Sequence, residues 1–351
     1  MKLNPLVIGD LCAPVPIIQG GMGVGISLSS LAGAVAKEGG IGVISAAQPG
    51  YLEADFETDP LSSNLKALAY HIKKAKEISN GGVIGVNIMW AIRYYDEYVK
   101  CCVDNGADLI ISGAGLPLSL PALLEGTNVK YAPVISSLKA AKVLLGRWDK
   151  RNHAACDMVI IEGPAAGGHL GFTEEQLHDT AFYENFDLEI QSIIEYIKEI
   201  EIKYDKKIPV VFAGGVYDKE DMNHYLSLGC SGVQIATRFV TTYECDADEA
   251  YKQAYINAKA EDIVITKSPV GLPGRAIKNE FISNDTSREK ITKCHQCLKR
   301  CDMTKIPYCI TAGLTRAAKG DTEHSLLFCG TNAARADKIV YVKEIMDELT
   351  M

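Results

Sequence analysis

The chain is predicted to fold as one (β/α)8 TIM barrel, and three features of the sequence predict it. Eight short apolar runs, rich in β-branched residues, recur along the first two-thirds of the 351 residues. The runs are continuously apolar rather than alternating, which is typical of parallel strands covered on both faces. Helical patterns separate the runs, and this alternation favours a barrel over a doubly wound open sheet, the structural alternative.

The expected strands and helices follow one another along the chain. Strands are expected at 16–22, 41–46, 83–89, 109–115, 130–136, 158–164, 209–216 and 232–239. Helices are expected at 29–38, 63–79, 92–105, 138–146, 188–203, 219–228 and 247–259, with a proline-containing helical stretch at 116–126. Gly39 and Gly229 follow two of these helices, where a left-handed cap suits glycine.

The alternation stops at about residue 262. Residues 1–262 are therefore expected to form the barrel, and residues 263–351 a C-terminal extension packed on it. The extension contains turn-forming residues, a cysteine cluster and a final amphipathic stretch at 336–349.

Composition and charge restrict the partners. The 44 acidic residues outnumber the 36 basic ones, for a net charge of -8, which disfavours nucleic acid or an anionic membrane surface as the main partner. The N-terminal sequence lacks a signal-peptide pattern, and no apolar run is long enough to cross a bilayer. We therefore expect a cytoplasmic protein with reduced thiols and a small-molecule substrate, and leave open whether it forms a homo-oligomer.

The first and third expected strands end in residues suited to a planar ligand. The first ends in Gln19, Gly20, Gly21, Met22 and Gly23, and the glycines would let the backbone approach a ligand closely. The third carries Asn87, whose carboxamide can both donate to and accept from a heterocycle. A tight turn and a capping asparagine are the ordinary alternatives. Active sites of barrels lie at these strand ends, which favours the functional interpretation.

The seventh and eighth strands predict a phosphate site. Gly214 and Gly215 end the seventh strand, and the eighth contains Gln234, Ala236 and Thr237. The loops after these two strands are the usual phosphate cradle of this fold, because backbone amides and a helix N-terminus point into them.

The sixth strand ends in Glu162 and a glycine-rich loop that holds Gly167, Gly168 and His169. His169 is the one histidine at an expected strand end, and we interpret it as catalytic, with a pKa suited to proton transfer near neutrality. A structural hydrogen-bonding histidine is the alternative.

The ordered set of motifs resembles one superfamily. The motifs are PIIQGGM, GVNIM, EGPAAGGHLG, FAGGV, GVQIATRF and GRAIKN, spread over residues 5–280. Together they resemble the nitronate monooxygenases (formerly 2-nitropropane dioxygenases) and the FMN-dependent enoyl-acyl-carrier-protein reductases. The resemblance implies a TIM barrel that binds FMN and oxidises a small nitronate, or reduces an unsaturated or electrophilic substrate. NAD(P)H is a donor compatible with the reductase reaction, and no dinucleotide fingerprint is visible.

The resemblance also implies roles for the strand-end residues. By position, Gln19–Gly23 and Asn87 would contact the flavin ring, and His169 matches the active-site histidine of the family. The cofactor site would further be lined or held by Glu162, Gly167, Gly168, Gly214, Gly215, Gln234, Ala236 and Thr237.

The cysteine cluster departs from this family. Cys294, Cys297, Cys301 and Cys309 form a C-x2-C-x3-C-x7-C pattern, which in a reducing compartment indicates a metal site. We expect a [4Fe-4S] cluster, with structural zinc or free thiols as alternatives.

Two other functional classes remain open at this point. One is a phosphate-binding barrel isomerase or aldolase without flavin, although no lysine for Schiff-base chemistry lies at an expected strand end. The other is a flavin- or metal-binding electron carrier or redox sensor, in which the cysteine segment would be the working part.

Overall fold

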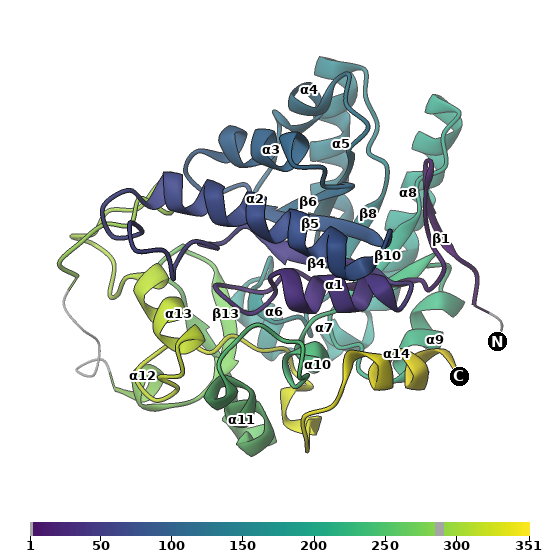
Figure 1. The fold of residues 1–351 in the computed structure, drawn as a ribbon. Helices are drawn as coiled ribbons and strands as arrows, with labels where there is room; N and C mark the ends of the chain where they lie inside the picture. Colours follow the sequence, from purple (N-terminus) through teal and green to yellow (C-terminus); the bar gives the residue numbers. More distant parts are fainter. Residues whose placement is uncertain (1–2, 285–290) are drawn as a thin grey trace.

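In a computed structural model, which describes residues 3–284 and 291–351, eight parallel strands close into a barrel (Figure 1). Each strand lies within one of the eight runs predicted from sequence, so the TIM barrel is confirmed. In chain order the barrel strands are β3 (Ile17–Gln19), β4 (Ile41–Ser45), β5 (Val83–Met89), β6 (Leu109–Gly113), β7 (Lys130–Ile135), β8 (Val159–Glu162), β10 (Val210–Ala213) and β11 (Gly232–Ile235). The barrel closes where β11 pairs with β3, with Gln234 opposite Ile18.

The principal helices of the barrel lie outside the strands, as Figure 1 shows for α1 and α2. They are α1 (Ser29–Lys37), α2 (Pro60–Ser79), α3 (Tyr95–Asp104), α4 (Leu120–Leu124), α5 (Leu138–Asn152), α8 (Phe186–Tyr204), α9 (Lys219–Ser227), α10 (Thr237–Val240) and α11 (Glu249–Asn257). Two short helices, α6 (Glu174–His178) and α7 (Thr180–Glu184), lie in the connection that follows β8.

Apolar side chains fill the barrel interior at the end where the strands begin. Ile41, Val83 and Leu109 stand at the starts of their strands and belong to this interior cluster. The antiparallel hairpin of β1 (Leu6–Ile8) and β2 (Leu11–Ala13) adds Leu6 and Ile8 to the same cluster. Because this end is apolar and filled, the polar side chains at the opposite strand ends are left to form a site.

A distant carboxylate caps α1. Leu28, the residue before this helix, provides no side-chain hydrogen bond. The carboxylate of Asp246 instead accepts from the backbone N–H groups of Leu28, Ser30 and Leu31 at 2.8 to 3.2 Å. The loop after α10 thus satisfies donors that the local sequence leaves unpaired.

Residues after 262 contact the loops at the C-terminal ends of the barrel strands. β12 (Ile263–Lys267) and β13 (Pro273–Ile277) form a hairpin, and β13 pairs with β9 (Gly168–His169) in the loop that follows β8. This three-stranded sheet was not predicted from sequence.

The remaining helices of this segment are α12 (Glu280–Ser283), α13 (Ile310–Ala318) and α14 (Val342–Thr350). The amphipathic stretch predicted at 336–349 contains most of α14, which packs against α1 and α9 (Figure 1). No helix within the described part of the chain is long and apolar enough to cross a membrane.

Candidate active site

Two adjoining cavities open at the C-terminal ends of the barrel strands. The larger has a volume of about 480 Å³ and the smaller about 110 Å³. Both are lined by Gly21, Glu162, Gly167, Gln234, Ala236 and Thr237. The shared lining makes them one elongated site, with a wide compartment suited to a ring system and a narrow one suited to its tail.

The first strand end brings backbone rather than side chains to the site. Gly20 and Gly21 line the cavities, whereas the buried Gln19 does not. Its carboxamide accepts from the Val43 N–H at 3.1 Å and donates to the Gly20 carbonyl, so it supports the glycine turn from below. A Cβ atom on Gly21 would lie 2.5 Å from the Cβ of Asn87, so glycine is required there.

Met22, Gly23 and Asn87 line the wide compartment, as their sequence positions predicted. Asn87 lies near the C-terminal end of β5, paired with Ser45 of β4. Its carboxamide is therefore presented to the cavity at the height of the glycine turn.

The narrow compartment lies between the ends of β10 and β11. Gly214 and Gly215 have positive φ angles of 113° and 81°, which turn the backbone around it. The oxygen of the Gln234 carboxamide is buried without a hydrogen-bond partner among the described residues. Such an atom calls for a donor from a bound molecule.

His169 lines the wide compartment and is held by two residues of the extension. Its Nε2 lies 2.7 Å from the hydroxyl oxygen of Ser268, and its ring meets the Phe328 ring edge-on at 4.8 Å between centroids. The surrounding protein lowers the pKa of His169 to about 4 by burial. This corrects the expectation of a pKa near neutrality, because burial disfavours the imidazolium and leaves a neutral ring at pH 7.

Glu162 ends β8 and lines both compartments. Burial raises the pKa of its carboxyl group to about 7, and no other group among the described residues contributes to that shift. A half-buried carboxyl without a hydrogen-bond partner among the described residues is costly, so a bound molecule with hydroxyl groups would satisfy it.

The segment that carries the clustered cysteines covers the wide compartment. Leu298 bridges to Ile92 in the loop after β5, and the backbone N–H of Arg93 donates to the carbonyl of Cys297 at 3.1 Å. The Lys299 ammonium lies 3.4 Å from the centroid of the Trp90 ring. Cys297 and Leu298, together with Ile310, Thr311 and Leu314 at the start of α13, form this roof.

The four clustered thiols are not arranged as a metal site. Within residues 3–284 and 291–351, no group of three or more His, Cys, Asp or Glu side chains is placed to hold a metal ion. Cys297 lines the wide compartment, whereas Cys309 lines a separate cavity and lies 3.6 Å from Nδ1 of His295. The structure therefore does not support the [4Fe-4S] or zinc site that the spacing predicts.

Sequence reasoning missed the residues that the extension supplies. Ser268 and Phe328 contact His169, while Gly330, Thr331 and Asn332 line the narrow compartment. Ser136 and Tyr217, in barrel loops, were missed as well. Turn-forming residues at 268–273 and at Gly330 were local signals, but a contact across the fold leaves no periodic pattern that would assign them to the site.

These residues fit a flavin mononucleotide. The orphaned Gln234 oxygen, the unpaired Glu162 carboxyl and the glycine turns at 20–21 and 214–215 call for a molecule with donors, hydroxyl groups and a phosphate. When bound, FMN supplies a two-electron carrier that the side chains lack. Fold and site thus define a flavin-dependent oxidoreductase on a TIM barrel.

Comparison with known proteins identifies the family. The family model described as nitronate monooxygenase matches residues 6–351, and the chain belongs to that family. A Staphylococcus saprophyticus protein named "Probable nitronate monooxygenase" is 28% identical over 306 residues, which cover 80% of this chain and 81% of that protein.

Solved structures agree with this assignment. FabK from Thermotoga maritima is 26% identical and has a TM-score of 0.70, with 95% of this chain and 91% of that chain covered. A nitroalkane oxidase from Streptomyces ansochromogenes has a TM-score of 0.70 at 20% identity, covering 96% and 94% of the two chains, and shows the shared fold. The chain is therefore a flavin-dependent enzyme, and membership of this family supports FMN as its cofactor.

Proposed function

We propose that this enzyme oxidises a small nitronate with FMN, in the wide compartment beside His169. The observation that carries the proposal is the neutral imidazole of His169, held by Ser268 at the cavity wall. None of the described residues that line the wide compartment is a lysine or arginine. A nitronate would therefore be bound by neutral donors. No ion pair would stabilise the anionic substrate and so oppose its oxidation.

The side chains divide the work of binding and orientation. Asn87 and His169, which both line the wide compartment, would donate hydrogen bonds to the nitro oxygens. The roof residues Leu298, Ile310 and Leu314 exclude water from the reacting carbon. Because the ring of His169 carries no charge, it orients the substrate without stabilising the anion more than its oxidised product.

A second candidate is the reduction of a neutral unsaturated substrate with NAD(P)H as donor. The observation in its favour is the apolar character of the roof, which suits an aliphatic chain better than a small anion. The similarity to FabK from Thermotoga maritima, at 26% identity, supports this candidate, because the sequence motifs also resemble the enoyl-acyl-carrier-protein reductases. NAD(P)H would dock over the flavin transiently, because no dinucleotide fingerprint accompanies the barrel.

An anaerobic absorbance titration distinguishes the two candidates. We expect the FMN-loaded protein to lose its flavin absorbance on addition of propyl-2-nitronate and to keep it with NADH or NADPH. Bleaching by a nicotinamide followed by recovery with an unsaturated thioester would establish the reductase instead. A protein that binds no flavin after reconstitution would refute both.

Other expectations from the sequence remain predictions. We retain a cytoplasmic location and the absence of a nucleic-acid partner, and leave the homo-oligomer open. The function proposed here does not use a metal at the four cysteines. The metal site predicted from the spacing of these cysteines is tested separately, by analysis of iron, acid-labile sulfide and zinc in anaerobically purified protein.

A further inference from the structure

We propose that Gln48 is a substrate-binding residue, whose carboxamide N–H groups donate to an oxygen of the substrate in the wide compartment. Gln48 was not among the site residues predicted from the sequence, because it lies in the loop after β4 and not at a strand end. The inference rests on the proposed oxidation of a nitronate and adds one neutral donor to its binding site.

The Gln48 side chain is buried in the wall of the wide compartment. It lines that cavity, and 4% of the residue is exposed. It lies three residues beyond Ser45, the last residue of β4, which pairs with Asn87 of β5. Tyr51, in the same loop, has the Lys319 ammonium 5.8 Å from its ring centroid, and Lys319 directly follows α13. The loop thus leads from the strand ends toward the helix that covers the compartment, and it places Gln48 beyond the residues expected to contact the flavin ring.

Two hydrogen bonds fix which end of the Gln48 carboxamide faces the cavity. The backbone N–H of Gly50 donates to Oδ1 of Asn64 at 3.0 Å, so Nδ2 is the donor atom of the Asn64 carboxamide. That Nδ2 donates to Oε1 of Gln48 at 2.8 Å. The oxygen of Gln48 is therefore bound by the protein, and no hydrogen bond among the described residues uses its Nε2. A buried amide donor calls for an acceptor, which a molecule in the cavity would supply.

The backbone holds Gln48 in a conformation that glutamine seldom adopts. Its φ angle is 51°, in the left-handed region that favours glycine. The loop is fixed against α2, because Asn64 belongs to that helix and a Cβ atom on Gly50 would lie 2.5 Å from the backbone of Ser63. Strained residues of this kind cluster at functional sites, where the surrounding structure holds a side chain in one place. Here the strained backbone keeps the carboxamide in the cavity wall.

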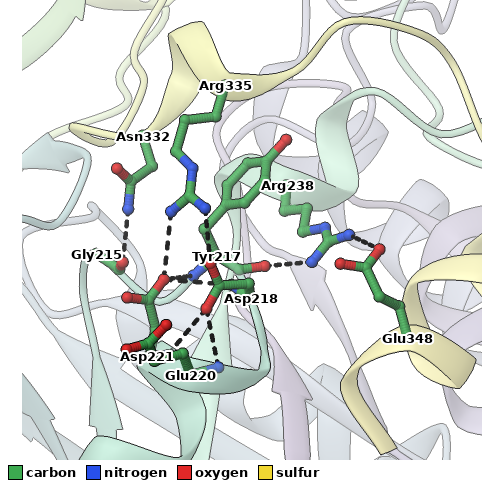
Figure 2. A network of polar contacts seen from close by, with 9 residues as sticks. All are labelled: Gly215, Tyr217, Asp218, Glu220, Asp221, Arg238, Asn332, Arg335 and Glu348. Atoms are coloured by element: carbon green, nitrogen blue, oxygen red, sulfur yellow. Dashed lines mark hydrogen bonds and ion pairs between the residues drawn. The ribbon is translucent and has the colours of Figure 1, made fainter. Parts of the chain in front are cut away.

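The carboxamide of Asn332, at the narrow compartment, is by contrast paired with the protein. It donates to the Gly215 carbonyl at 2.6 Å, and Arg335, on the same segment, pairs with Asp218 at 2.7 Å (Figure 2). An amide used in this way holds the C-terminal segment on the barrel. The Gln48 amide has no such partner among the described residues, so its position supports the binding of a substrate instead.

The test combines steady-state kinetics with propyl-2-nitronate and titration of the FMN-loaded enzyme with nitrate, a planar anion that is not oxidised. Gln48→Glu keeps an acceptor toward Asn64 and replaces the N–H groups with a carboxylate oxygen. We expect it to raise KM and the Kd of nitrate about tenfold or more, with a smaller change in kcat, because it removes a hydrogen bond to an anion and adds a like charge. Gln191→Glu, exposed on α8, is the matched control and should change neither constant.

Two further variants separate the donor from the added charge. Gln48→Met removes the N–H groups without adding charge and should also raise KM about tenfold. Asn64→Asp leaves Gln48 in place but exchanges its donor for an acceptor, so the Gln48 carboxamide should turn its N–H groups toward the new carboxylate and its oxygen toward the cavity. We expect the same rise in KM, which a residue that only supported the loop would not produce.

The outcomes separate this inference from the proposed function. An unchanged KM in both Gln48→Glu and Gln48→Met overturns the inference and leaves the nitronate-oxidising enzyme intact. A loss of FMN affinity without a change in KM also overturns it, because the amide would then face the flavin. If the unaltered enzyme does not oxidise the nitronate, the proposed function fails and the inference fails with it. If Gln48→Glu does not fold, as judged by circular dichroism, Gln48→Met decides alone.

Discussion

Nε2 of His169 lies 2.7 Å from the hydroxyl oxygen of Ser268, 99 residues further along the chain. The backbone N–H of Val270 donates to the same hydroxyl at 3.4 Å, which leaves the hydroxyl hydrogen free to be donated to the imidazole. Ser268 therefore orients the His169 ring, as a positioning residue does.

Substituting Ser268 tests this relationship. We expect Ser268→Ala to lower kcat about tenfold with little change in FMN affinity, because the ring loses its orientation and not its contact with the cavity. Ser268→Thr should restore most of the activity. Steady-state kinetics and flavin titration measure the two effects. Ser192→Ala, on α8 and away from the site, is the control, and equal losses of kcat and FMN affinity would point to a structural role.

The pH dependence of turnover follows from the lowered pKa of His169. Because its pKa is about 4, the ring is neutral throughout pH 5–8 and cationic only in stronger acid. We expect the pH profile of kcat to show no ionisation of this residue between pH 5 and 8. His169→Gln should lower kcat about 100-fold or more and should not add an ionisation to the profile. A kcat profile with a pKa near 6.5 that disappears in His169→Gln would contradict the neutral ring.

The stability of the flavin-free protein should depend on Glu162. Its pKa of about 7 in the folded state exceeds the ordinary value of 4.5, so between pH 4.5 and 7 the folded state binds a proton that the unfolded state has lost. The free energy of unfolding therefore falls as pH rises through this window and stays level, for this group, above it.

Glu162→Gln removes this dependence. We expect the stability of the variant relative to the unaltered protein to rise by up to about 3 kcal/mol from pH 4.5 to pH 7. Urea unfolding of flavin-free samples at several pH values measures the difference. If the difference in the free energy of unfolding between the two proteins does not vary with pH, folding does not raise the pKa of the Glu162 carboxyl group.

Two glycine substitutions should act in opposite directions. Gly21→Ala would place a Cβ atom 2.5 Å from that of Asn87, so we expect a loss of about 1–3 kcal/mol of stability and weaker FMN binding. Gly146→Ala lies within α5, where nothing is within 4 Å of the added methyl group. It should stabilise the protein by about 0.5–1 kcal/mol and leave FMN binding unchanged. Urea unfolding and flavin titration check both, and a neutral Gly21→Ala would show that the turn can shift.

The barrel and many of the residues that line the two compartments could be predicted from the sequence, whereas the segments that cover them could not. The eight strands were predictable because a buried parallel strand is a continuous apolar run. Asn87 was found because it lies near the end of such a run, and His169 because it follows one. Gln19 follows one too, yet its side chain supports the turn instead of facing the cavity. A strand end specifies a position, and packing decides where the side chain points.

The sequence by itself determined the strand order, the glycine turns and the end of the barrel that bears the site, because each depends on residues close together in the chain. Only the tertiary structure decided what covers that site. Asp246 caps α1, Ser268 holds His169 and Asn332 lines the narrow compartment beside Gly215, across separations of 99 residues or more. The tertiary structure also lowers the pKa of His169 and places Cys297 and Cys309 in the walls of different cavities. Burial and contacts between distant residues depend on how the whole chain packs, and a local sequence pattern does not predict them.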